Sequence, residues 1–177
     1  MKNYFLVLLS FAFIFVSCSK DPCEDVVCVN GVENEVDSDT CICECDSGFE
    51  GNLCENEIRQ NYYGTYQGPE NCGAGGSFTY SLTVAEGDTA DVATITLNGL
   101  FGDPGVSVTA NLTAQSNYVN IQIPEQTVSG QSGNYTFSGN GNFNFDAEGE
   151  VSSVSLSYNI SATGGISFNC TGEFDRQ

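Results

Sequence analysis

Residues 154–170 read VSLSYNISATGGISFNC, and this stretch decides the fold class. Apolar or aromatic side chains occupy every second position, first at Val154, Leu156, Tyr158 and Ile160, then at Ile166, Phe168 and Cys170. A period of two is typical of a half-buried β-strand, and a Gly-Gly pair between two such runs is typical of a turn. The stretch therefore predicts two antiparallel strands that bury the same face.

The same alternation extends over the rest of the chain after residue 61. Counting residues 62–67, it gives about nine strand candidates, centred on residues 78–84, 93–97, 106–112, 119–123, 135–137, 143–145, 154–160 and 166–170. Turn signals separate them at residues 86–88, 98–99, 102–105, 139–141 and 164–165. Short connections favour antiparallel neighbours. The sequence predicts a mainly β chain, in which residues 62–177 form an antiparallel β-barrel or β-sandwich of about eight to nine strands.

The N-terminus reads as an export signal. Lys2 precedes an apolar run from Tyr4 to Val16, which is too short for a membrane span of about 20 residues but suits a signal peptide. The end of the run, Phe15-Val16-Ser17-Cys18, resembles the lipobox of bacterial lipoproteins. That resemblance implies a signal peptide over residues 1–17 and a fatty-acylated Cys18 at the start of a tether, residues 18–22. Ser19, Lys20 and Asp21 resemble the surface-export signal of Bacteroidota-type lipoproteins.

Cysteine arithmetic supports an oxidising compartment. Of nine cysteines, Cys18 is expected to carry the lipid, six lie between residues 23 and 54, and Cys72 and Cys170 remain as a pair. Because Cys170 is in phase with Ile166 and Phe168, its sulfur should point inward. A bridge to Cys72 would then tie the first strand of the large domain to the last. The expected location is the outer membrane, with the chain lipid-anchored and displayed at the cell surface.

The last two of the six clustered cysteines enclose glycines at characteristic positions. Residues 43–54 read CECDSGFEGNLC, which resembles the C-terminal half of an EGF-like domain. The resemblance implies an EGF-like domain over residues 23–55, with the pairings Cys23–Cys41, Cys28–Cys43 and Cys45–Cys54. From the residues alone, six cysteines allow many other connectivities. Residues 56–61 are expected to form a polar linker, and the acidic segment 33–39 is expected to form a solvated loop rather than a calcium site.

The large domain resembles the small lipocalin-like β domains of bacterial surface lipoproteins. The shared features are Gly64-Thr65-Tyr66, the stretch at residues 121–126 and the late Cys170. This resemblance implies no catalytic residues.

The composition argues against several functions. The chain has no histidine, so the usual general base and the Ser-His-Asp triad are missing. Without Lys2, the mature chain keeps three positive residues against 23 acidic ones, so its net charge is −20, one below the −19 of the whole chain. This charge disfavours nucleic acid as a partner. Asp146, Glu148 and Glu150 are expected to form a polar turn rather than a glycosidase pair. We therefore expect no enzyme, no cofactor and no metal site.

Two function classes remain. The first is a surface interaction or adhesion module, held at the membrane by its lipid and facing a protein or glycan partner of unknown identity. The second is a carrier that binds a small apolar ligand inside a barrel, in a candidate ligand pocket formed by Tyr80, Phe137, Phe143 and Phe168. In addition, Asp88-Thr89-Ala90 resembles the Asp-Thr-small motif that Bacteroidota-type cells O-glycosylate, which makes Thr89 a candidate site.

Overall fold

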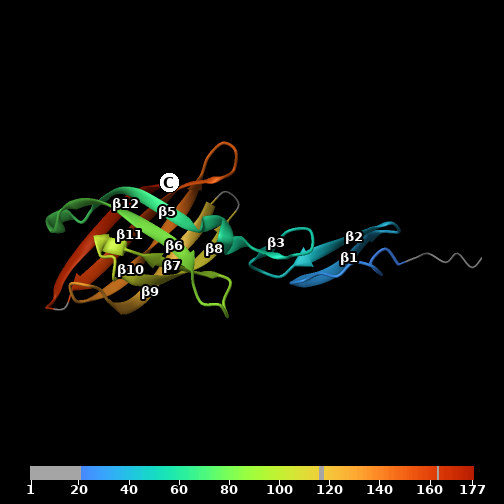
Figure 1. Cartoon of the computed structure of the whole chain (residues 1–177), viewed down its shortest axis with the longest axis horizontal. Helices are drawn as coiled ribbons and strands as arrows, with labels where there is room; N and C mark the ends of the chain where they lie inside the picture. The colour runs from blue at the N-terminus through green and yellow to red at the C-terminus, as the bar shows by residue number, and fades with distance from the viewer. Residues whose placement is uncertain (1–20, 116–117, 163) are drawn as a thin grey trace, which may run out of the picture.

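The computed structural model describes residues 21–115, 118–162 and 164–177, as a disulfide-rich module attached to one end of a β-barrel. Figure 1 shows the module and the barrel lying end to end. The predicted signal peptide and the predicted lipid-anchor residue Cys18 lie outside the described residues. Within the described parts of the chain, no helix has the length and hydropathy that a bilayer crossing requires.

The N-terminal module consists of two small antiparallel hairpins. In the first, β1 (Gly31–Asp37) pairs with β2 (Thr40–Cys45), and in the second, β3 (Phe49–Glu50) pairs with β4 (Asn56–Glu57). The acidic segment expected to form a loop is thus a strand and its turn, although Glu33 and Glu35 are exposed as expected. Across the hairpin, Glu33 pairs with Cys43 and Glu35 pairs with Cys41. The acidic segment is therefore held as a strand by β2, which is itself fixed by two disulfides.

The larger domain is a closed, eight-stranded antiparallel barrel, which decides between the barrel and the sandwich. Each strand pairs with the next along the chain, and β12 closes the barrel against β5. The strands are β5 (Gly64–Asn71), β6 (Ser77–Glu86), β7 (Thr94–Asn98), β8 (Ser107–Gln115), β9 (Tyr118–Ser129), β10 (Asn134–Phe145), β11 (Val151–Ala162) and β12 (Ile166–Arg176). Short 3-10 helices, η2 (Gly73–Gly75) and η3 (Leu100–Gly102), lie at the end of the barrel away from the module.

The strand count is eight because residues 139–141 do not form the expected turn. They lie within β10, paired with both β9 and β11. A Cβ on Gly141 would fall on the carbonyl oxygen of Ser155 and within 2.6 Å of the Leu156 side chain. These glycines therefore permit close approach of neighbouring strands rather than reversing the chain.

Side chains from every strand fill the barrel. Fully buried examples, at 0–1% exposure, are Tyr66, Leu82, Ile95, Leu97, Val108, Ile121, Phe137, Phe143, Val154, Ile160 and Phe174. Because each strand contributes alternate residues to this core, the period of two in the sequence corresponds directly to the inward face.

The segment expected to be a polar linker is ordered and forms the junction between the two parts. It consists of β4 and the 3-10 helix η1 (Ile58–Tyr62), in which Arg59 is 1% exposed. Arg59 donates hydrogen bonds to the carbonyl oxygens of Asp88, Asp91 and Thr94 at 2.8–3.3 Å, and it pairs with Glu57 at 2.7 Å and Glu86 at 3.1 Å. One guanidinium thus fastens the linker to the β6–β7 loop.

Candidate functional site

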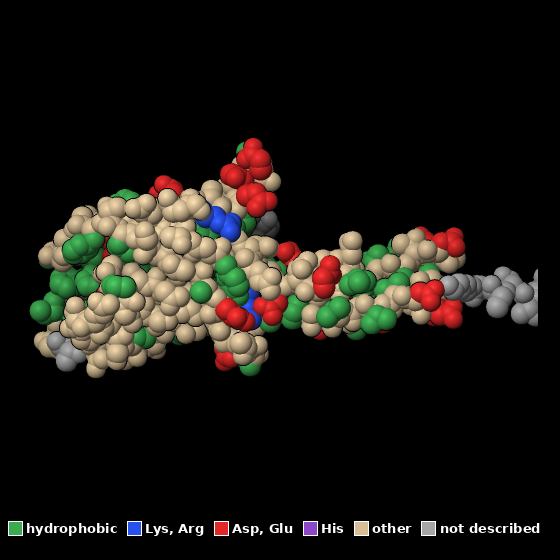
Figure 2. All heavy atoms as spheres, in the orientation of Figure 1, with side chains coloured by type: hydrophobic (Ala, Val, Ile, Leu, Met, Phe, Trp, Pro, Cys, Tyr) green, Lys and Arg blue, Asp and Glu red, His purple; other side chains and the backbone are tan. Residues whose placement is uncertain are grey.

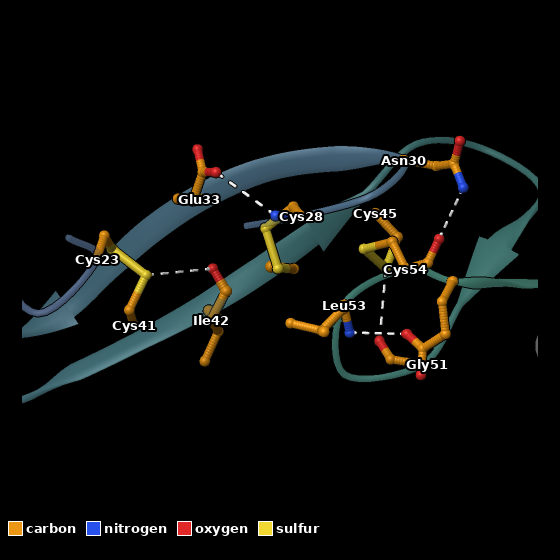
Figure 3. Close-up of a disulfide and its surroundings, with 12 residues drawn as sticks. Cys23, Cys28, Asn30, Glu33, Cys41, Ile42, Cys45, Gly51, Leu53 and Cys54 are labelled. Atoms are coloured by element: carbon orange, nitrogen blue, oxygen red, sulfur yellow. Dashed lines mark hydrogen bonds between the residues drawn. A yellow bond between two sulfur atoms is a disulfide. The ribbon is translucent and has the colours of Figure 1, made fainter. Parts of the chain in front are cut away.

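Three disulfides hold the N-terminal module together. They join Cys23 to Cys41, Cys28 to Cys43 and Cys45 to Cys54, the same pairings that the EGF-like resemblance implies. Figure 3 shows them stacked along the β1–β2 hairpin, where Asn30 donates a 3.0 Å hydrogen bond to the carbonyl of Cys54. Gly48 and Gly51 have φ values of 94° and 100°, which other residues rarely adopt. The module therefore owes its shape to cross-links and turns rather than to a core.

A fourth disulfide joins Cys72 to Cys170 and so ties β5 to β12, as expected. Both cysteines are buried, and Glu70 lies beside them. The potential ligand atoms of these three residues are within 4.8 Å of one another. Since both sulfurs belong to the disulfide, neither is a thiolate that could bind a metal ion.

Glu70 is the least expected residue of the barrel interior, because its side chain is buried without a basic partner among the described residues. Two hydroxyls donate to its Oε1 atom instead, from Tyr158 at 2.6 Å and from Tyr80 at 2.9 Å. Tyr80 in turn accepts a 3.1 Å hydrogen bond from the backbone N–H of Phe101, a residue with a φ of 61°. The carboxyl group is therefore part of a continuous polar network that reaches η3.

Burial dominates the acid–base chemistry of this network. It raises the pKa of Glu70 above its ordinary value, although the hydrogen bonds from Tyr158 and Tyr80 oppose the shift. Burial, together with the nearby carboxylate, also raises the pKa of Tyr80 and of Tyr158. The two tyrosines therefore remain hydrogen-bond donors at physiological pH. Because the Glu70 side chain is buried, we interpret the network as a structural part of the barrel interior.

The four residues of the candidate ligand pocket fall into separate parts of the core. Tyr80 donates to the same Glu70 oxygen as Tyr158 does. Phe137 packs against Tyr158 with ring centroids 5.7 Å apart. Phe168 lies against η2, near Gly75. Phe143 belongs to the module end of the barrel, where it stacks on Tyr62 with centroids 4.6 Å apart. The four rings do not surround one common space.

The other predicted features occupy turns. Asp146 closes the β10–β11 turn, as expected for a polar turn, because its Oδ1 accepts the backbone N–H groups of Glu148 and Glu150 at 3.1 and 2.9 Å. Thr89 is exposed in the β6–β7 loop, next to the Asp88 carbonyl that Arg59 holds. Its accessibility is compatible with modification.

The outer face of the barrel is mostly uncharged. On the face in view, Figure 2 shows backbone and side chains that are neither charged nor apolar over much of the barrel body, with acidic groups gathered at a projecting turn, at the junction and on the module. Two hollows lie on this face. One of about 410 Å³ covers β8, β9 and β10, and one of about 500 Å³ covers β11, β12, β5 and β6.

The end of the barrel away from the module carries a small apolar rim. Ile166 and Phe78 are 59% and 42% exposed there, and Phe78 contacts Phe101 edge-on with ring centroids 5.9 Å apart. Asp103 fastens the nearby loops, since its carboxylate accepts backbone N–H groups from Gly105 and Gln131 at 2.8 and 3.0 Å.

No known protein-family model matches the chain, and no curated protein is similar enough to count as a relative.

Three residues that organise this geometry were missed by the sequence analysis: Arg59, Glu70 and Asp103. For each of them a signal was present. Glu70 is in phase with the inward Tyr66, and Arg59 is one of only four Lys and Arg residues in the chain. Asp103 lies in a turn signal, where a carboxylate that caps backbone N–H groups is common.

Proposed function

We propose that the protein is a non-catalytic interaction module of the bacterial cell surface, exported by residues 1–17 and anchored through acylated Cys18 in the outer membrane. Its partner is a protein or a glycan. The EGF-like module holds the barrel away from the membrane, and the barrel presents its outer face.

The observation that carries this proposal is the packed barrel interior. Side chains at 0–1% exposure come from all eight strands, and a side chain facing a water-sized internal cavity would be more exposed than this. A carrier needs an enclosed space of several hundred Å³ for its ligand. The outer surface is therefore better suited to recognition than the lumen.

The junction supports the role of the N-terminal module as a spacer. Arg59 spans the linker and the β6–β7 loop with five polar contacts, and Tyr62 of η1 stacks on Phe143 of β10. A fixed junction keeps the barrel at a set distance from the anchor.

Surface proteolysis of intact native cells tests the location. We expect external protease to digest the protein before lysis, while a periplasmic control protein survives. Protection until lysis would contradict surface display. A titration with a fluorescent fatty acid tests the carrier alternative, because saturable binding that Phe137→Trp abolishes would favour a ligand inside the barrel.

A further inference from the structure

The outer face carries a row of short polar side chains that runs across the strands. The pairings Asn111–Gln122, Gln122–Asn140, Asn140–Ser157, Ser157–Thr171, Thr171–Asn71 and Asn71–Ser77 place one residue from each of seven strands in lateral register. All seven are exposed and uncharged. We name these seven residues the polar belt. At a strand spacing of about 4.8 Å, the belt is about 30 Å long.

Both outer hollows lie on the polar belt. Gln122 and Asn140 line the hollow of about 410 Å³. Asn71, Ser77 and Thr171 line the hollow of about 500 Å³, and Ser157 of the belt lies on β11 between the two. Each hollow is within the usual size range of small-molecule sites. Their linings meet at the β10–β11 pair, where Gly141 and Asn142 of the first hollow pair with Leu156 and Ser155 of the second.

The belt side chains keep their hydrogen-bonding capacity free. Asn71 accepts a bond from the backbone of Gly73, but the other six belt side chains have no partner among the described residues. Some other polar side chains of the outer face pair with a neighbour. Bonded examples are Thr127 with Thr136 at 2.8 Å, Asn159 with Asn169 at 3.1 Å, and Ser161 with Ser167 at 2.7 Å. The belt therefore offers free hydrogen-bond donors and acceptors to a ligand.

The chemistry of the belt selects one class of ligand. Amide and hydroxyl groups each supply a donor and an acceptor, which matches the hydroxyls of a sugar. A peptide strand has no sheet edge to join, because the barrel is closed, and the belt has none of the aromatic or arginine anchors typical of protein interfaces. The net charge of the chain disfavours anionic polymers.

We infer that the polar belt binds a neutral glycan, which lies across the strands and follows the curved barrel wall from one hollow to the other. This inference rests on the proposed surface function and names the class of partner. The site is shallow and open to water, so each sugar unit contributes little, and affinity grows with the length of the oligosaccharide.

The test is a titration of the oxidised full mature chain, labelled with nitrogen-15 and followed by NMR. The probes are neutral hexasaccharides of glucose, mannose, galactose and xylose, with the corresponding disaccharides and an oligogalacturonate as controls. We expect at least one neutral hexasaccharide to shift the side-chain amide signals of Gln122 and Asn140, and to bind more tightly than its disaccharide.

Variants locate the site. Because Gln122 and Asn140 are exposed, Q122A/N140A should fold normally and weaken binding by at least about fivefold. The matched control, N159A/N169A, removes two outer-face amides that lie off the belt and should bind like the wild type. No shift with any neutral hexasaccharide, equal weakening in both variants, or shifts confined to the rim around Phe78 and Ile166 would overturn the inference. If surface digestion succeeds and this titration fails, only the glycan assignment falls.

Discussion

Glu70 offers a sharp test of the barrel interior, because two substitutions at this position separate its charge from its hydrogen bonds. Both tyrosine hydroxyls donate to the same oxygen, Oε1. In Glu70→Gln the amide oxygen can accept both bonds, while the buried charge is removed. In Glu70→Ala neither hydroxyl keeps its acceptor.

The expected magnitudes differ accordingly. Each hydroxyl left unsatisfied in Glu70→Ala costs about 1–3 kcal/mol, and the lost side chain adds a cavity, so the total is about 3–6 kcal/mol. Glu70→Gln should stay within about 1 kcal/mol of the wild type near pH 4.5, where the raised pKa of Glu70 favours the protonated carboxyl group in the fold.

The pH dependence has a definite sign. Because the folded pKa of Glu70 is raised above its ordinary 4.5, the folded state holds this proton more tightly than the unfolded state does. The wild type therefore loses stability from this group as pH rises from about 4.5 through the raised pKa, at up to about 1.4 kcal/mol per pH unit. Glu70→Gln lacks this loss, so its stability relative to the wild type should increase with pH.

Urea unfolding with the disulfides intact, from about pH 4.5 to pH 8.5, measures both effects. The difference between wild type and Glu70→Gln cancels the contributions of the other carboxylates. Parallel stability curves for the two proteins, or a Glu70→Gln variant as unstable as Glu70→Ala at high pH, would refute the account of a buried carboxyl group held by two hydroxyls.

Four other changes test separate parts of the structure. Arg59→Ala should lower the free energy of unfolding by about 3–5 kcal/mol, because it leaves buried acceptors unpaired. Hydrogen exchange should speed up in the β6–β7 loop, and unchanged exchange there would contradict the role of Arg59 at the junction. Asp103→Asn should destabilise by about 1–2 kcal/mol at neutral pH. Because backbone N–H donors hold the pKa of Asp103 below its usual 3.8, this deficit should shrink as pH falls below about 4, and a deficit independent of pH would argue against the carboxylate as acceptor. Replacing Cys72 and Cys170 together by Ala should cost up to about 4.7 kcal/mol in urea unfolding, whereas an unchanged midpoint would show that barrel closure needs no bridge. Gly141→Ala should destabilise by at least about 1 kcal/mol, and a neutral effect would contradict the close strand approach within β10.

Much of the barrel could be predicted from alternation alone. The inward residues of β11, such as Val154 and Ile160, are those that the period of two marked, and Cys170 points inward because it shares that phase. Such patterns succeed because burial on one face of a strand acts on every second residue. The prediction of a turn at the β10 glycines was wrong, because local sequence does not distinguish a glycine that turns the chain from one that lets two strands approach.

The polar interior could not be predicted from sequence for a different reason. Glu70 needs Tyr158 from a strand 88 residues further along the chain, and Arg59 needs carbonyl oxygens from a loop about 30 residues away. Such partners exist only once the barrel has closed. The polar belt likewise depends on the register of seven strands, which side-chain periodicity leaves open.

The most direct test of the central claim is the mass of the N-terminal peptide of the native protein, isolated from membranes and digested without reduction. A chain exported and anchored as proposed begins at Cys18, carries fatty acyl groups on that residue, and contains the other eight cysteines as four disulfides. A mature chain that begins elsewhere, or a Cys18 without lipid, would contradict the proposal of a lipid-anchored surface module.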